Sequence, residues 1–349
     1  MIRIPQISVS YEGNDITADI SPHLISFTYT DVLTDRSPDI SLELEDSQGN
    51  WLQDWYPKKG AVLKASIFYV GEPPLDCGLF ELDQFEFSFP PSTISLGALA
   101  TFITLSLREK RSEAYEEQSL KAIAETVAAR NGLTLTGEIE DITIDRTTQD
   151  DQTDLEFLVR ISKEYNYLVK IENGQLIFNT QEAIEKLPPA FILNSQEIKT
   201  LRLTDKREGI YKSCEISYQL GTEKEEIKFT VDDPFITDGD VLKITEKVEN
   251  QEQAVEKATA ALKKANSTQI EGSLTTEGIN NFLAGTTFDL DGFGVFAGKY
   301  VAMEIAQTLT KNGGWESKAT IRKINPETAT IAGRESTPTG NQDATETEL

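Results

Sequence analysis

A glycine-rich segment, residues 289–298, is where residue types and spacing come closest to a binding motif. Gly292 and Gly294 resemble a phosphate-binding loop, but such a loop must open a helix, and the residues that follow alternate like a strand. Asp289 and Asp291 resemble the start of a calcium loop, whose twelfth position must be a glutamate and is Tyr300 here. We therefore interpret these glycines and aspartates as turn residues.

Catalytic chemistry finds little support elsewhere in the sequence. His23 is the only histidine, which nearly excludes a histidine-based metal site or catalytic triad. Asp238 and Asp240 form a second calcium-like turn, but no ligand set follows them. Acidic residues are abundant, yet none lies in a distinctive apolar or aromatic setting that would raise its pKa for glycoside hydrolysis. We predict no enzymatic activity, no cofactor and no metal site.

Four further side chains have a functional and a structural interpretation. Trp51 and Trp55, four residues apart, would serve either as a ligand platform or, as we expect, as core or interface packing. Cys77 and Cys214 lie far apart in strand-like segments, and we predict a buried free thiol at each.

The charge balance constrains the partners of the chain. The sequence has 33 basic and 58 acidic residues, a net charge of -25. Tight nucleic-acid binding needs clustered lysine and arginine, so we predict none. No apolar run approaches the roughly 20 residues that span a bilayer, and the N-terminus does not resemble a secretory signal, so we predict no membrane insertion.

Most of the predicted secondary-structure elements are strands. The longest alternating apolar–polar pattern is that of a hairpin near the end of the chain. Residues on both sides of the turn Asn312-Gly313-Gly314 alternate between apolar and polar. We predict a hairpin with one buried face that closes a sheet or barrel. Its apolar positions are the candidate contacts to neighbouring subunits or to a tube: Val301, Met303, Ile305, Leu309, Trp315, Ala319 and Ile321.

The order of patterns predicts a mainly β, α+β fold in three parts and a tail. Residues 1–111 form a first β region, 112–189 an inserted α+β unit, and 190–325 a second β region with a helix at 251–265. Residues 326–349 lack periodicity and are predicted to be a disordered acidic tail.

Local signals predict individual features of these parts. The change of phase at Asp83 and Gln84 predicts a β-bulge. Thr153 and Glu156 match a capping box that opens a helix. Asn173-Gly174 predicts a tight hairpin turn. Alternation at 103–107 predicts one more strand.

Four stretches, in order, resemble the late control protein D family, which comprises baseplate hub proteins of contractile phage tails and is akin to the N-terminal part of VgrG spike proteins. The stretches are residues 39–67, residues 77–100, residues 119–135 with 153–178, and residues 252–265 with 281–324. The resemblance covers about residues 1 to 325. It implies two tube-protein-like antiparallel β-barrels per chain, with the α+β unit outside them and one helix beside the second barrel.

The family resemblance also implies an assembly. Three chains would form a pseudo-sixfold ring that joins the hexameric tail tube to a trimeric spike. The implied partners are two further copies of the chain, the tail tube protein, a separate spike protein, and baseplate wedge and LysM-type tube-end proteins. The chain would assemble in the bacterial cytoplasm into a phage tail or contractile injection particle. Alternatives from other classes are a tail-associated peptidoglycan or glycan hydrolase and a carbohydrate-binding module.

Overall fold

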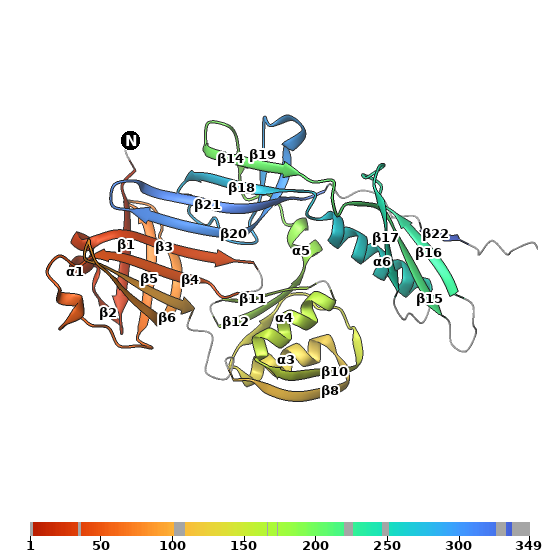
Figure 1. Cartoon of the computed structure of the whole chain (residues 1–349), viewed down its shortest axis with the longest axis horizontal. Helices are drawn as coiled ribbons and strands as arrows, with labels where there is room; N and C mark the ends of the chain where they lie inside the picture. Colours follow the sequence, from red (N-terminus) through yellow and green to blue (C-terminus); the bar gives the residue numbers. More distant parts are fainter. Residues whose placement is uncertain are drawn as a thin grey trace, which may run out of the picture. The chain divides into compact units, whose positions relative to one another are not determined.

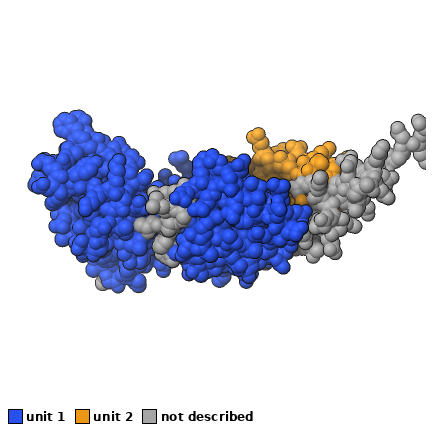
Figure 2. All heavy atoms as spheres, turned by 90° about the horizontal axis from the view of Figure 1, so that it is seen from below, with its two compact units in different colours: residues 1–203, 272–324 blue, residues 204–271, 325–349 orange. Residues whose placement is uncertain are grey.

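The computed structural model describes residues 3–33, 36–100, 109–165, 167–172, 174–219, 226–245, 251–325 and 333–336. The chain divides into two compact units (Figure 2), one of residues 1–203 with 272–324 and one of residues 204–271 with 325–349. Both are rich in strands, which confirms the mainly β, α+β fold class (Figure 1). The predicted strand at 103–107 and Asn173 of the predicted turn lie outside the described residues.

The first unit is built on one large sheet, with 13 strands among the described residues. Its main path runs β14-β18-β21-β20-β3-β4-β7-β6-β5-β1-β2, and β13 and β19 pair beside β20. The strands are β1 (Pro5–Tyr11), β2 (Asn14–Asp15), β3 (Leu24–Val32), β4 (Asp39–Glu45), β5 (Val62–Tyr69), β6 (Leu75–Ser88), β7 (Thr93–Ala100), β13 (Ile192–Leu193), β14 (Ile198–Asp205), β18 (Ile270–Glu277), β19 (Thr287–Leu290), β20 (Gly298–Thr310) and β21 (Gly314–Lys323). Short helical turns accompany them: α1 (Thr17–Ile20), η1 (Ser21–His23), η2 (Asn50–Leu52) and η3 (Gly294–Phe296).

The C-terminal hairpin pairs directly with an N-terminal strand. β20 and β3 are antiparallel, in a register that places Leu309 opposite Phe27. Both side chains belong to the same buried cluster, which also contains Trp315. The first and second predicted β regions therefore share one sheet and part of one core, although about 270 residues separate the paired strands.

Two of the register shifts in this sheet concern residues singled out in the sequence. The predicted bulge in β6 is confirmed, because the pairing with β7 slips between Leu82 and Gln84. A second bulge interrupts β20 between Ala302 and Glu304. It was not predicted, and it moves Met303 out of the simple alternation that placed it with Ile305. Since the side-chain period of a strand is two, one extra residue reverses the face of everything before it.

Residues 111–186 of the first unit form three helices and two small sheets, most of which surround a core of their own. The elements are β8 (Arg111–Ser119), α3 (Leu120–Arg130), β9 (Thr134–Thr136), β10 (Thr143–Gln152), α4 (Asp154–Glu164), β11 (Tyr167–Glu172), β12 (Gln175–Thr180) and α5 (Gln181–Lys186). The predicted capping box is confirmed, since Thr153 and Glu156 exchange side-chain and backbone hydrogen bonds. Tyr115 stacks on Phe157 within the core, with ring centroids 5.2 Å apart.

A buried carboxylate fixes the two helices of this segment. Asp154 is fully buried and accepts hydrogen bonds from Arg130 Nε at 3.0 Å and Nη2 at 2.7 Å. Asn131 and Gln149 donate to the same carboxylate at 2.7 and 3.0 Å. A buried charge is tolerated when it is paired and its lone pairs are satisfied, so Asp154 serves packing rather than catalysis.

The second unit is a four-stranded sheet with one helix on it. The strand order is β17 (Asp240–Thr245), β15 (Tyr211–Gln219), β16 (Glu226–Asp232) and β22 (Gly333–Ser336). Helix α6 (Gln251–Asn266) confirms the helix predicted at 251–265. Its fully buried Ala254 and Ala258 share a core with Cys214 and Phe229, as expected where small residues let a helix approach a sheet closely.

The tail prediction needs one correction. Gly333–Ser336 forms strand β22, which pairs antiparallel with β16 from Lys228 to Val231. Backbone pairing to an existing strand does not require a periodic apolar pattern, so this strand could not be predicted from periodicity. Residues 326–332 and 337–349 lie outside the described residues.

Candidate functional site

The hairpin of β20 and β21 is the centre of the predicted contact site. Leu309 lies opposite Trp315 and Ile305 opposite Ala319, as the alternation indicated. Six of the seven predicted contact side chains are buried within the chain itself, and Met303 is half-buried. The hairpin therefore contributes core. Since β18 and β3 already pair with its two outer edges, a contact between subunits would have to use its other face or other elements. Its part in an interface stays a prediction.

A buried amide organises this hairpin. Gln307 is fully buried, and its Oε1 accepts hydrogen bonds from Trp315 Nε1 and Ser317 Oγ, both at 2.7 Å. Its Nε2 donates to the carbonyl oxygen of Phe282 at 2.7 Å. Gln307 was not among the predicted site residues, although its place among apolar residues of one parity was an available signal. Because every polar group in this network finds a partner, it specifies how the 278–286 loop lies on the hairpin.

Gly278 shows how closely that loop approaches. Its N–H donates to the carbonyl oxygen of Trp315 at 2.8 Å, and a Cβ added at Gly278 would overlap the indole ring. We expect Gly278→Ala to lower the free energy of unfolding by about 1–3 kcal/mol, the usual cost of overpacking a core. Gly97→Ala is the matched control, since its Cβ would meet only ordinary contacts and should change stability by less than about 0.5 kcal/mol. Urea denaturation measures both, and equal effects would contradict this account of Gly278.

The glycine-rich segment 289–298 is a turn, as predicted. Asp289 pairs with Lys299 in the β19–β20 ladder, and η3 lies within the turn. Phe288 stacks against Tyr300, whose hydroxyl donates to the carbonyl oxygen of Phe296 at 2.8 Å. Among the described residues, no group of three or more histidine, cysteine, aspartate or glutamate side chains could hold a metal ion.

Burial raises the pKa of Tyr300 to about 12, against about 10 in an unfolded chain. The unfolded state therefore loses this proton first as the pH rises. The stability that Tyr300 contributes is complete below pH 10 and is lost between about pH 10 and pH 12, by roughly 2–3 kcal/mol at most. Tyr300→Phe should lose less stability between pH 9 and pH 11 than the unaltered protein in urea titrations. Parallel pH profiles for the two proteins would contradict this assignment.

The remaining chemical candidates behave as structural residues. Trp51 is buried, and Trp55 meets it edge to face with ring centroids 5.6 Å apart. Cys77 and Cys214 are free and buried, as predicted. Burial raises the pKa of the Cys77 thiol, so little reactive thiolate forms at neutral pH.

Ion pairs fasten the α+β segment to the large sheet. Asp31 of β3 is fully buried, and its Oδ2 accepts from Lys170 Nζ of β11 at 2.9 Å and from the backbone N–H of Ala284 at 2.9 Å. Arg322 of β21 donates to Glu185 of α5 at 2.8 Å. Segments from three parts of the sequence thus meet at charged groups that are largely withdrawn from water.

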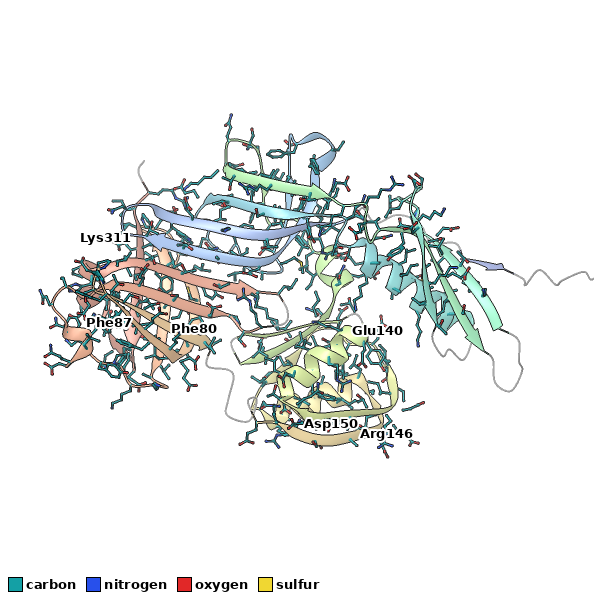
Figure 3. The ribbon with its side chains drawn as sticks, in the orientation of Figure 1. Phe80, Phe87, Glu140, Arg146, Asp150 and Lys311 are labelled. Atoms are coloured by element: carbon teal, nitrogen blue, oxygen red, sulfur yellow. The ribbon has the colours of Figure 1, made fainter. Side chains whose placement is uncertain are left out.

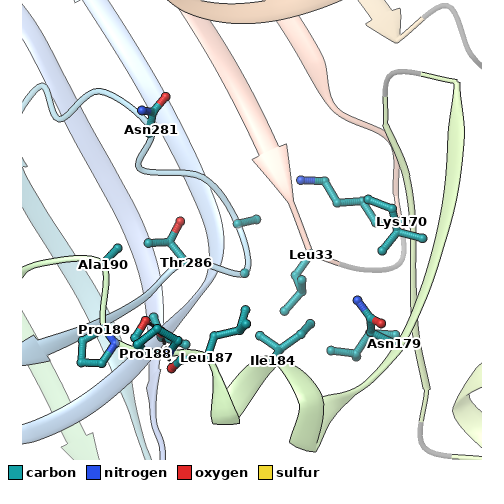
Figure 4. A pocket seen from close by; sticks show the side chains of 15 residues that line it. Leu33, Lys170, Asn179, Ile184, Leu187, Pro188, Pro189, Ala190, Asn281 and Thr286 are labelled. Atoms are coloured by element: carbon teal, nitrogen blue, oxygen red, sulfur yellow. Dashed lines mark hydrogen bonds between the residues drawn. The ribbon is translucent and has the colours of Figure 1, made fainter. Parts of the chain in front are cut away.

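A cavity of about 570 Å³ lies beside these ion pairs (Figure 4). Its lining is mostly apolar and includes Leu33, Ile184, Leu187 and Pro188, with Lys170 at one side. It lacks a convergent set of polar groups that would orient a small ligand, so we assign it no chemistry.

A group of exposed aromatic side chains comes from the tip of the β6–β7 hairpin and from the loop before β5. Phe89 is 75% exposed, and Phe87, labelled in Figure 3, is also exposed. Tyr56 packs on Phe85 with ring centroids 4.9 Å apart, and Trp55 is 40% exposed. We refer to Trp55, Tyr56, Phe85, Phe87 and Phe89 as the aromatic tip. An exposed aromatic group of this kind marks a protein contact more often than a catalytic site.

No helix within the described part of the chain is long and apolar enough to cross a membrane.

Comparison with known proteins gives two curated relatives. The chain is 27% identical over 176 residues to the probable baseplate hub protein of Escherichia phage 186, and 28% identical over 176 residues to that of Escherichia phage P2. The matches span 50% of this chain but only 44% and 45% of the two relatives. No family model matches the chain.

A solved structure shares the fold over nearly the whole length. The 43 kDa tail protein of prophage MuSo2 from Shewanella oneidensis superposes with a TM-score of 0.71 at 18% identity. The alignment covers 91% of this chain and 98% of that one. The names of these proteins are those of hub and tail proteins, which favours the predicted structural role over the hydrolase alternative.

The chain is similar in sequence to two baseplate hub proteins and similar in fold to a phage tail protein. Both agree with the resemblance that the four sequence stretches indicated. The chain is therefore a relative of the baseplate hub proteins of phage tails, and it has the fold of a phage tail protein.

Proposed function

We propose that three copies of this chain form the hub ring of a contractile tail or injection machine. The ring would join a hexameric tail tube to a trimeric spike, and the chain would work by assembly rather than catalysis. The observation that carries the proposal is the shared sheet, in which strand β3 of the first β region pairs with strand β20 of the second. If each chain contains two tube-protein-like barrels, a ring of three chains contains six of them.

The proposed partners are those that the family resemblance implies. The tail tube protein would stack on the pseudo-sixfold face, and a separate spike protein would take the threefold face. Baseplate wedge and LysM-type tube-end proteins complete the set, and the particle would assemble in the bacterial cytoplasm. At a net charge of -25 per chain, an acidic channel would repel DNA or other acidic cargo that passes through it.

Light scattering tests the assembly. We expect a particle of three times the 38.8 kDa chain mass, and a larger complex when the tube protein is added. A monomer at every concentration, with and without the tube protein, would overturn the hub proposal. Clearing of purified cell wall by the chain alone would replace it with the hydrolase.

A further inference from the structure

Among the described strands of the large sheet, β14 and part of β6 leave long backbone edges open. Strand β6 pairs with β5 only as far as Glu81, and Gly60 and Ala61 continue the bonding to Leu82. From Asp83 to Ser88, the pairing within the described residues is with β7 alone. At the other end of the sheet, β14 has one neighbour, β18. An open edge is a template for pairing with another chain unless it is short, bulged away or covered.

The open part of β6 combines acidic and aromatic residues. Glu81, Asp83 and Glu86 lie in a stretch of six residues that contains no lysine or arginine. The side chains of Asp83 and Glu86 are exposed. Beside them lies the aromatic tip, the kind of surface that supplies most of the binding energy at protein contacts.

The open edge of β14 has the opposite charge. Lys199 and Arg202 are exposed, and residues 198–203 contain no acidic residue. Lys199 forms an ion pair with Glu316 at 2.8 Å, but both side chains are nearly half exposed, and such pairs contribute only about 0–1 kcal/mol. The pair can therefore be exchanged for another at small cost.

The two edges match in charge and in sequence spacing. Asp83 and Glu86 are three residues apart, and so are Lys199 and Arg202. Because Asp83 is the bulged residue of β6, a register that sets Glu86 opposite one basic residue brings Asp83 near the other, whether the strands run parallel or antiparallel. Local complementarity of this kind matters for this chain, because two copies that each carry -25 repel one another elsewhere on their surfaces.

We propose that the Asp83–Ser88 edge of β6, with the aromatic tip, pairs with the β14 edge of a second copy of this chain. The contact joins two different surfaces, so it is head-to-tail and closes into a ring when the rotation per subunit allows. Strand addition supplies backbone hydrogen bonds, and the two charge pairs select the register. The inference rests on the proposed trimer and names the surfaces that hold it together.

Charge exchange tests the contact in the full chain by light scattering. Asp83→Lys with Glu86→Lys makes both edges basic, and Lys199→Glu with Arg202→Glu makes both acidic. We expect each double variant to weaken self-association at least about tenfold, so that its mass falls toward that of one chain. All four substitutions together restore opposite charges and should restore the mass of the unaltered protein.

The controls separate this inference from the function it rests on. Asp145→Lys with Asp150→Lys changes the charge equally on exposed residues of β10 and should leave the mass unchanged. Circular dichroism confirms that every variant folds. The proposed contact would be overturned by any of three results: a trimer in both edge variants, loss of the trimer in the β10 control, or no trimer in the variant with all four substitutions. Each of these results would leave the hub proposal standing. An unaltered protein that stays monomeric would overturn both.

Discussion

Replacing Asp31 with alanine is expected to lower the free energy of unfolding of the first unit by about 3–5 kcal/mol. The substitution removes the carboxylate that faces Lys170, whose side chain is only 11% exposed, and it takes the acceptor from the Ala284 N–H. Leaving a buried ammonium without its carboxylate costs more than the pair itself contributes. Urea denaturation followed by circular dichroism measures the loss, and hydrogen exchange of β11 amides should rise with it.

Two companion variants make this prediction specific. Asp76→Ala breaks the Lys64 ion pair, whose side chains are both more than half exposed, and should cost less than about 1 kcal/mol. Asp31→Leu combined with Lys170→Met removes both buried charges and should recover much of the loss. If Asp31→Ala cost no more than Asp76→Ala, the buried pair would not hold the α+β segment to the sheet.

Replacing Trp315 with alanine is expected to cost about 3–5 kcal/mol, the range for removing a large aromatic side chain from a core. Trp315 is almost fully buried, packs on Tyr69 with ring centroids 4.9 Å apart, and donates its indole N–H to Gln307. The variant leaves a cavity beside the 278–286 loop and deprives Gln307 of one of its donors. Urea denaturation at neutral pH gives the magnitude.

The matched control is the same substitution at Trp55. Its side chain is 40% exposed at the aromatic tip, so Trp55→Ala should cost roughly 1 kcal/mol or less in the isolated chain. Trp315→Phe keeps much of the ring but loses the N–H, and it should fall between the two. A Trp55→Ala effect as large as that of Trp315→Ala would show that exposure does not separate their roles.

Several features were predictable because their signals are local. The capping box at Thr153, the hairpin turn at Gly313 and the small-residue face of α6 each depend on residues within a few positions of one another. The bulge near Asp83 was visible because apolar residues on both sides of it mark the two phases. The bulge at Met303 could not be predicted, because Val301 and Ile305 are both apolar, and the pattern of residue types therefore shows no change of phase between them.

The candidate contact residues show the limit of this reasoning. Alternation places an apolar side chain on a face, but it does not say whether that face meets the chain's own core or another subunit. Ile305, Trp315 and Ile321 meet their own core in this structure. The exposed surface lies instead at Phe87 and Phe89, which the sequence presents as one more apolar strand.

By itself, the sequence determined the mainly β composition, the inserted α+β segment and the absence of a recognisable catalytic motif. Those follow from periodicity, capping and residue type, which are properties of short segments. Only the tertiary structure decided that β3 pairs with β20, that Asp31 meets Lys170, and that Gln307 is buried under Trp315. These contacts join residues that are distant in the chain, or they depend on which of two faces is buried, and alternation does not distinguish the faces. They form because a buried charge or amide group is costly unless it is paired, and only the folded chain brings its partner close.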